Sequence, residues 1–115
     1  MVEKTNKRLF NSSLSILEIG AGDGFILKFL KGKGHRVLGV DISERAAAIM
    51  KKNGIPAKRI DILNERILTD EKFDLVLLMS ILEHIPEAEN FFQRSYEYTK
   101  KYMFVAIPNT GYWVK

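Results

Sequence analysis

Apolar and β-branched runs alternate with stretches of helical periodicity along most of the chain. This alternation is typical of βαβ units, in which parallel strands form a sheet and helices cover its faces. The sequence therefore predicts an α/β fold, with one domain spanning residues 1–115. The predicted strands are residues 14–19, 36–40, 73–79 and 102–107, with a short third strand inside residues 55–63.

Helices are predicted in the intervals between these strands. The first ends at Gly32 or Gly34, because glycine adopts the left-handed conformation that often closes a helix. The second begins after Ser43, a residue type that caps helices, and ends at residues 53–54. The third begins near Pro86, since proline is accepted in the first turn. The expected apolar faces are Ile26, Phe29 and Leu30 in the first helix, Ala46, Ala47, Ile49 and Met50 in the second, and Ala88, Phe91, Phe92 and Ser95 in the third.

Composition excludes several classes of protein. The net charge of +4 is small and the basic residues are scattered, so no nucleic-acid partner is predicted. The absence of cysteine excludes disulfides, a thiolate nucleophile and cysteine-based zinc sites, and no metal site is predicted. Apolar runs such as residues 75–79 are far too short to cross a bilayer. A cytoplasmic protein without a membrane partner is therefore expected.

A glycine-rich turn between the first strand and the first helix is the most informative segment. Residues 18–24 read Glu-Ile-Gly-Ala-Gly-Asp-Gly, and the missing side chains let the backbone approach a ligand closely. Asp41 follows at the end of the second strand, where its carboxylate can accept both hydroxyl hydrogens of a ribose. The two features together predict binding of an adenosine-type ligand.

These motifs resemble those of the class I S-adenosylmethionine-dependent methyltransferases. The resemblance rests on the glycine-rich turn, Asp41, Asp61 and residues 73–74 and 83–86, and it covers about residues 14–109. The run Ser-Ile-Leu-Glu-His-Ile-Pro at residues 80–86 is similar to the small-molecule branch that includes ubiquinone and menaquinone biosynthesis enzymes. The resemblance implies a Rossmann-like parallel sheet with strand order 3-2-1-4-5 in three α/β/α layers, and S-adenosylmethionine as cofactor.

The family's cofactor contacts carry over to particular positions of this sequence. Gly20 and Gly22 would pass beneath the methionine portion, Glu18 would order the loop or its water contacts to the ammonium group, and the backbone of residues 79–80 would lie near that group. The complete implied set is Glu18, Gly20, Ala21, Gly22, Gly24, Asp41, Ile42, Asp61, Ile62, Met79 and Ser80.

The adenosine portion has its own implied contacts. Asp41 would bind the ribose and Ile42 would lie against the adenine face. Asp61 would accept a hydrogen bond from the adenine amino group, with Ile62 beside it.

Other roles are open for several of these residues. Glu18 is equally suited to bracing the loop through local amides, and Asp61 is also interpretable as a simple turn residue. His84 could act as a general base, but a histidine ahead of a proline is at least as often a packing or capping residue, and Glu83 is similarly ambiguous. No other catalytic residue is predicted. The aromatic residues of the third helical region, Phe91, Phe92, Tyr96 and Tyr98, are interpreted as core.

The sequence departs from the family after its fifth predicted strand. A complete class I core has a seven-stranded sheet with a hairpin after strand five, whereas five strands are predicted here. Residues 108–115 are interpreted as a short aromatic tail, which makes the fold a truncated class I core whose fifth strand is an exposed edge unless something covers it. Self-association through the edge of that strand is a hypothesis, because unpaired strand edges readily pair with another chain.

Three functions are compatible with these features. The first is methyl transfer from S-adenosylmethionine to an unidentified small-molecule acceptor. The second is a non-catalytic module or remnant that binds this cofactor. The third, a nicotinamide-dependent oxidoreductase, is disfavoured because Phe25 stands where the G-x-G-x-x-G fingerprint requires glycine and because Glu18 precedes the turn.

Overall fold

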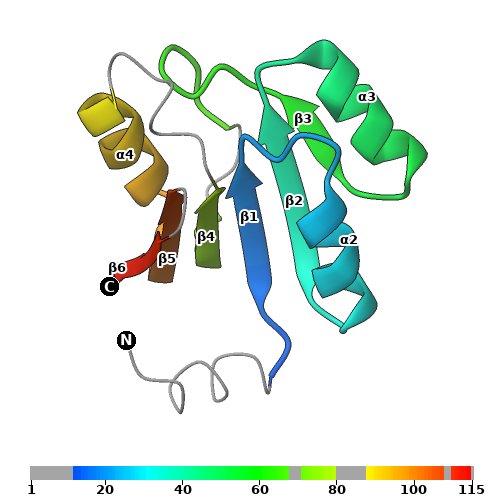
Figure 1. Ribbon diagram of the computed structural model, residues 1–115, viewed down its shortest axis with the longest axis horizontal. Coiled ribbons are helices and arrows are strands. Elements are labelled where there is room, and N and C mark those ends of the chain that lie inside the picture. The colour runs from blue at the N-terminus through cyan, green and yellow to red at the C-terminus, as the bar shows by residue number, and fades with distance from the viewer. Residues whose placement is uncertain (1–11, 68–70, 80–87, 108–109, 115) are drawn as a thin grey trace.

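The computed structural model describes residues 12–67, 71–79, 88–107 and 110–114, and within them the strands form one six-stranded sheet (Figure 1). The strand order is β3-β2-β1-β4-β5-β6. In chain order the elements are β1 (Ser15–Ile19), α2 (Phe25–Gly32), β2 (Arg36–Asp41), α3 (Glu44–Lys52), β3 (Ala57–Arg59), β4 (Phe73–Met79), α4 (Ala88–Tyr96), β5 (Thr99–Ile107) and β6 (Thr110–Val114).

The parallel part of the sheet confirms the predicted order 3-2-1-4-5. β1 lies at its centre, with β2 on one side and β4 on the other, both parallel to it. A reciprocal pair of hydrogen bonds joins the starts of β1 and β4: the Ser15 amide donates to Asp74 Oδ2 and the Asp74 amide donates to Ser15 Oγ, each over 3.0 Å. These bonds help to set the register in which Ile16 lies opposite Leu75. The carboxyl ends of the four inner strands consequently meet at one edge.

The interpretation of the last residues as a tail outside the sheet is wrong, and the edge of the fifth strand is covered. β6 pairs antiparallel with β5, and the register runs from Ile107 opposite Thr110 to Met103 opposite Val114. The sequence interpretation ended the sheet at the Pro-Asn pair, whereas residues 110–114 have the β-branched and aromatic content of a strand. The edge of β5 is therefore occupied, and the hypothesis of self-association through it loses its structural basis.

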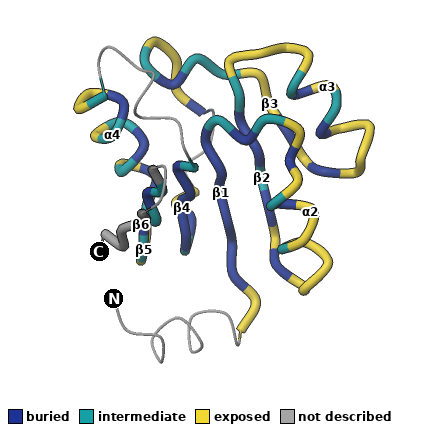
Figure 2. Tube along the Cα trace, in the orientation of Figure 1, coloured by how far each residue is buried: buried dark blue, intermediate teal, exposed yellow. Residues whose placement is uncertain are grey.

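Side chains alternate along the central strands and divide the core into two clusters. Ile16 and Leu75 belong to the cluster beneath α2 and α3, and Leu17 and Val76 belong to the cluster beneath α4. Figure 2 shows the strands buried between these helices, with exposed residues on the outer helix surfaces. This arrangement confirms the predicted α/β/α layers, since a parallel sheet must be covered on both faces.

One helix, α2, differs in part from the apolar face that the sequence predicts. In α2 the predicted residues Ile26 and Leu30 pack partly buried against the core, but the predicted Phe29 is 62% exposed and the fully buried residue is Leu27. The helix starts at Phe25, directly after a left-handed Gly24. Gly34 follows the last turn with a φ of 96°, as one of the two proposed helix-ending glycines.

The other two helices confirm their predicted faces. In α3 Ala47 and Met50 are buried, and in α4 Phe91 and Ser95 are buried. The start of α3 is also as predicted, because the Ser43 hydroxyl accepts a hydrogen bond from the Ala46 amide over 3.1 Å. The interpretation of the aromatic residues as core holds as well: Phe91 and Tyr98 are buried, and Phe92 and Tyr96 pack partly buried against the same cluster.

Gly22 and Gly24 allow a matched test of the packing beneath the glycine-rich turn. Both have positive φ angles, 61° and 78°, so alanine meets similar backbone strain at either position. A Cβ at Gly24 would lie 2.8 Å from Met50 Cγ, whereas a Cβ at Gly22 would meet nothing within 4 Å. We expect Gly24→Ala to lower the free energy of unfolding by about 2–4 kcal/mol and Gly22→Ala by about 1–2 kcal/mol, measured by chemical denaturation. Equal losses in the two variants would contradict this packing.

Candidate cofactor-binding site

The glycine-rich turn is fixed over the end of β2 by backbone hydrogen bonds. The amides of Gly20 and Ala21 both donate to the carbonyl of Val40, over 2.8 and 3.1 Å. The Gly22 amide donates to Asp41 Oδ2 over 2.9 Å. Gly20 and Gly22 have positive φ angles, so the sharp reversal between β1 and α2 depends on glycine. The turn is thus held in one conformation, with open space where a Cβ of Gly22 would lie.

Asp41 connects this turn to the start of the next helix. Its Oδ2 accepts from Gly22, and its Oδ1 accepts from the Ser43 amide over 2.9 Å. A carboxylate oxygen can accept two hydrogen bonds, so both atoms retain capacity for further donors. Ile42 lies between Asp41 and Ser43 in the sequence. It is 59% exposed, which is unusual for a large aliphatic residue. The end of β2 therefore presents a carboxylate beside an exposed apolar surface.

Glu18, near the end of β1 and just before the turn, is a buried acid without a complete set of partners. Its side chain is 3% exposed, and Oε1 makes no hydrogen bond within the described part of the chain. Burial, with smaller contributions from the nearby carboxylates of Asp23 and Asp41, raises the pKa of Glu18 to about 8. A buried carboxyl group in this state is ready to interact with a donor or a cation that enters the site.

Asp23 was missed as a site residue by the sequence interpretation. Its Oδ1 accepts a hydrogen bond from the Phe25 amide over 3.1 Å, at the start of α2. Its charge also contributes to the raised pKa of Glu18. The available sequence signal was an acidic residue just ahead of a helix, a common capping position.

Asp61 follows β3 and is engaged in a turn. Its Oδ1 accepts from the Leu63 amide over 3.2 Å and its Oδ2 accepts from Asn64 Nδ2 over 2.7 Å. Its backbone carbonyl accepts from the amides of Asn64 and Glu65. These contacts agree with the alternative interpretation of Asp61 as a turn residue, and they also fix the direction of its carboxylate.

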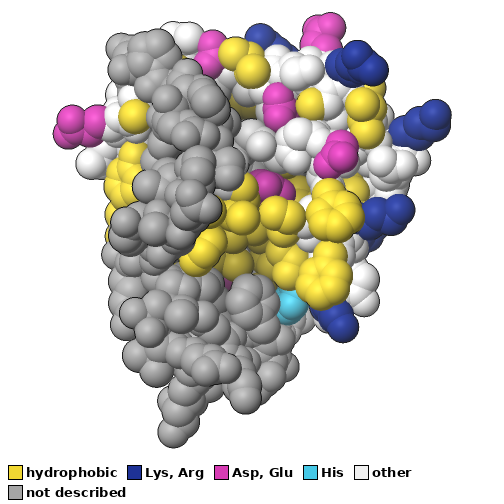
Figure 3. Space-filling view, viewed as in Figure 1, with side chains coloured by type: hydrophobic (Ala, Val, Ile, Leu, Met, Phe, Trp, Pro, Cys, Tyr) yellow, Lys and Arg dark blue, Asp and Glu magenta, His cyan; other side chains and the backbone are white. Residues whose placement is uncertain are grey.

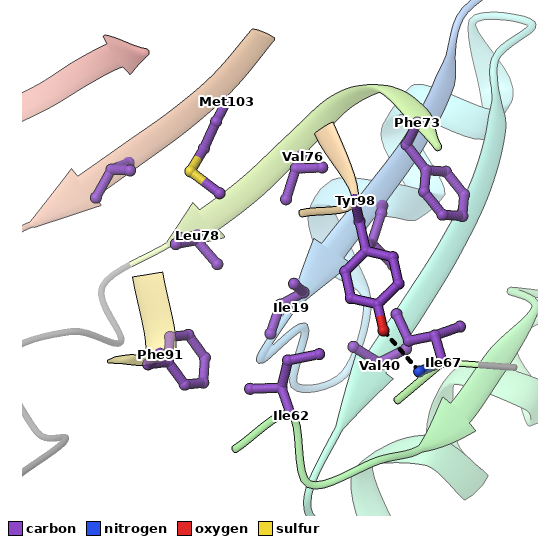
Figure 4. Packing of buried hydrophobic residues seen from close by; sticks show 12 residues of the cluster. Ile19, Val40, Ile62, Ile67, Phe73, Val76, Leu78, Phe91, Tyr98 and Met103 are labelled. Atoms are coloured by element: carbon purple, nitrogen blue, oxygen red, sulfur yellow. Dashed lines mark hydrogen bonds between the residues drawn. The ribbon is translucent and has the colours of Figure 1, made fainter. Parts of the chain in front are cut away.

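The neighbouring apolar residue Ile62 is part of the core. Its side chain is buried in the cluster beneath α4, where Figure 4 shows it near Ile19, Val40 and Phe91. The structure gives this side chain a packing role at the base of the turn.

The remaining predicted residues lie at or beyond the end of β4. Met79 is the last residue of that strand, and its partly buried side chain packs against the cluster beneath α2. Ser80, Glu83 and His84 lie outside the described residues. Gly24 is buried at the start of α2.

The predicted residues that the structure describes thus come from the ends of neighbouring strands. Figure 3 shows acidic side chains lying among hydrophobic ones on this face, with Lys and Arg toward its outer margin. The proximity of Glu18, Asp23 and Asp41 gives the turn an acidic character that suits a ligand with positive charge. The exposed Ile42 adds a surface for a flat apolar group. The site therefore fits a polar, partly cationic molecule with an aromatic portion.

Neither a metal-binding cluster nor a membrane-spanning helix is present in the described residues. Those residues contain no group of three or more His, Cys, Asp or Glu side chains placed to hold a metal ion. None of the helices they form is long and apolar enough to cross a membrane.

The strand order defines a Rossmann-like domain, a class of fold in which ligands are bound at the carboxyl ends of the parallel strands. The methyltransferase domain family matches residues 17–106, and the chain belongs to that family.

Known relatives agree with this assignment. The chain is 31% identical over 114 residues to a ubiquinone biosynthesis O-methyltransferase of Pelagibacter ubique, a match that covers 94% of this chain and 47% of the relative. It is 29% identical over 84 residues to the enzyme of the same name from Rickettsia felis, covering 70% of this chain and 34% of the relative. The chain thus spans between about a third and a half of the length of these relatives.

A solved structure shows the same fold. The magnesium protoporphyrin IX methyltransferase of Synechocystis, crystallised with bound S-adenosylmethionine, superposes with a TM-score of 0.75 at 20% identity. The similarity covers 95% of this chain and 55% of that one.

The burial of Glu18 predicts a pH-dependent stability. An ordinary glutamate has a pKa of 4.5, whereas Glu18 has a pKa of about 8 in the folded chain. Between these values the folded chain binds more protons than the unfolded chain, so the free energy of unfolding should fall as the pH rises and should level off above about 8. Glu18→Gln removes this penalty. We expect the variant to exceed wild type by about 2–4 kcal/mol at pH 8.5 and by less than about 1 kcal/mol at pH 5.

Urea denaturation at several pH values measures this difference. Glu44→Gln, at an exposed position in the first turn of α3, is the matched control and should show no comparable pH-dependent gain. A constant difference between Glu18→Gln and wild type across this range would show that Glu18 is charged in the folded chain at pH 5.

Proposed function

We propose that this chain forms the cofactor-binding domain of an S-adenosylmethionine-dependent methyltransferase. One observation carries the proposal: Glu18 is buried with an unpartnered oxygen, near Asp23 and Asp41, at the end of the strand that leads into a glycine-rich turn held by Asp41. A buried acid of this kind requires a donor or a cation to complete its interactions. The methionine ammonium group and the sulfonium of the cofactor supply positive charge at this position.

The described residues fit the parts of the cofactor in order. Gly20, Ala21, Gly22 and Gly24 provide the turn beneath the methionine portion, where Glu18 would order the loop and its contacts to the ammonium group. The free acceptor capacity of Asp41 would take the ribose hydroxyls. Ile42 would lie against the adenine ring.

The remaining contacts extend the same arrangement. Asp61 would accept from the adenine amino group, with Ile62 supporting the turn from the core. Met79 and Ser80 would approach the ammonium group through their backbone. The domain as a whole would occupy residues 1–115.

The chemistry follows from positioning. When bound, S-adenosylmethionine supplies a methyl group on a sulfonium, an activated leaving group that needs in-line attack by the acceptor. The protein residues would align the cofactor and exclude water from it. The acidic groups near the turn would favour the cationic cofactor over its neutral product. A protein base is optional in such a displacement. Both roles considered for His84, general base and packing or capping residue, stay predictions.

A small-molecule methyl acceptor is part of the proposal. It is supported by the two relatives named as ubiquinone biosynthesis O-methyltransferases, which act in the synthesis of a small molecule.

The cytoplasmic location expected from the sequence also stays a prediction, which fractionation of expressing cells would test.

Calorimetric titration of the 115-residue chain tests cofactor binding. We expect roughly micromolar dissociation constants for S-adenosylmethionine and S-adenosylhomocysteine, and a loss of about 10- to 100-fold in Asp41→Ala, because the ribose contact and the anchor of Gly22 are both removed. A nicotinamide dinucleotide should bind far more weakly.

A control variant separates site effects from general effects of charge. Glu71→Gln removes an exposed carboxylate that pairs with Arg36 and should bind like wild type. Absence of binding by a folded wild-type chain, or tighter binding of the nicotinamide dinucleotide, would defeat the proposal.

A further inference from the structure

An arginine on α4 makes contacts that the cofactor motifs do not explain. Arg94 Nε donates to the carbonyl of Ile62, and Arg94 Nη2 donates to the carbonyl of Glu65 over 3.2 Å. Both acceptors belong to the turn that begins at Asp61. The side chain is partly buried, and these partners are neutral carbonyls of the backbone. Arg94 therefore joins α4 to a loop that lies about thirty residues earlier in the sequence.

The segment that Arg94 holds has little regular structure of its own. β3 ends at Arg59, and residues 60–67 form turns and irregular backbone. Loops of this kind keep one conformation only when side chains or neighbouring elements hold them. The two carbonyls bonded by Arg94 lie at positions one and four after Asp61, so the clamp spans the turn in which the Asp61 carboxylate is oriented.

Two other contacts hold the far end of the same segment. The Ile67 amide donates to the hydroxyl of Tyr98 over 2.9 Å, as Figure 4 shows. Arg66 pairs with Glu97 over 2.9 Å in an exposed ion pair. Arg94 belongs to α4, and Glu97 and Tyr98 follow it directly. Of these three residues, Arg94 is the one that bonds the turn beside Asp61.

We propose that Arg94 is a positioning residue of the cofactor site, which holds the 61–65 turn so that the Asp61 carboxylate faces the adenine amino group. This inference rests on the proposed function. The planar guanidinium presents several donors in a fixed arrangement and can bond two carbonyls at once, whereas a lysine ammonium is a single flexible point. Glu65 Oε1 accepts from the Asp61 amide and from Arg59 on the side of β3, so loss of the Arg94 clamp frees the turn on the side of α4 and loosens the orientation of Asp61.

The test compares two ligands that differ at one group of the adenine. Calorimetry would measure the affinity of the 115-residue chain for S-adenosylhomocysteine and for its analogue in which the adenine amino group is replaced by an oxo group. The ratio of the two affinities reports the contact made by Asp61. A purely structural role of Arg94 would weaken both ligands equally and leave the ratio unchanged.

We expect Asp61→Asn and Arg94→Gln each to lower this ratio by roughly three- to tenfold. Arg94→Lys should fall in the same direction, because lysine cannot reproduce the double contact. Arg66→Gln is the matched control: it removes an arginine contact between the same two segments, and its ratio should stay within about twofold of wild type, since exposed ion pairs contribute little.

Hydrogen exchange in the ligand-free chain gives an independent measurement. The amides of Leu63 and Asn64 are bonded to Asp61 in the clamped turn. We expect these amides to exchange roughly three- to tenfold faster in Arg94→Lys than in wild type, with no comparable change in Arg66→Gln. This measurement also serves if Arg94→Gln does not fold.

The outcomes separate the two proposals. If the folded wild-type chain does not bind S-adenosylhomocysteine, the proposed function fails and the role of Arg94 fails with it. If the ligand binds but Asp61→Asn leaves the ratio unchanged, cofactor binding stands and the positioning role is overturned. If Asp61→Asn lowers the ratio while both Arg94 variants keep wild-type ratios and exchange rates, the role of Arg94 alone is overturned.

Discussion

The carboxylate of Asp41 is the interaction on which the site depends most directly. It accepts one hydrogen bond from the turn after β1, at Gly22, and one from the start of α3, at Ser43. These two segments are joined to different strands, and the carboxylate keeps them at a fixed separation. The parallel pairing of β1 with β2 brings the segments to one edge, and Asp41 then fixes their detailed arrangement. A ligand that binds here meets a site that is already formed, so little ordering free energy is lost on binding.

Glu18 opposes folding at the same edge that Asp41 organises. Its carboxyl group is buried near two other acids, and its ionised form is therefore unfavourable in the ligand-free chain. The favourable burial of the apolar residues that surround it on β1 makes this tolerable. A position that lowers stability while lacking a partner is typical of a binding residue, because natural sequences retain such costs mainly where function requires them.

Much of the fold could be predicted from periodicity, and the errors have local causes. β4 has the predicted bounds because residues 73–79 form a nearly continuous apolar run, and Ser43 caps α3 as its residue type suggests. Leu27 was missed because the apolar residues of α2 continue around the helix, so spacing alone does not fix its rotation. β6 was missed because a strand of five residues after a proline gives a weak pattern.

Some residues of the site could be predicted from local sequence motifs, whereas contacts between distant segments could not. Glu18, the glycines and Asp41 could be identified because their roles follow from motifs within one βαβ unit. The contacts of Arg94 could not be predicted, since its partners are backbone carbonyls about thirty residues away and carry no side-chain signal in the sequence. The turn role of Asp61 was weighed as an alternative, but its geometry depends on Leu63 and Asn64 and on the helix that packs behind it.

The two turns of the site rest on opposite faces of the sheet. The glycine-rich turn leads into α2 and rests on the cluster that includes Leu27 and Met50, whereas the turn at Asp61 rests on the cluster of Ile62 and Phe91 and is held by α4. The methionine end and the adenine end of a bound cofactor would thus be supported by separate parts of the core. A change in packing on one face should therefore affect one end of the ligand more than the other, because contacts that share no partners contribute nearly independently.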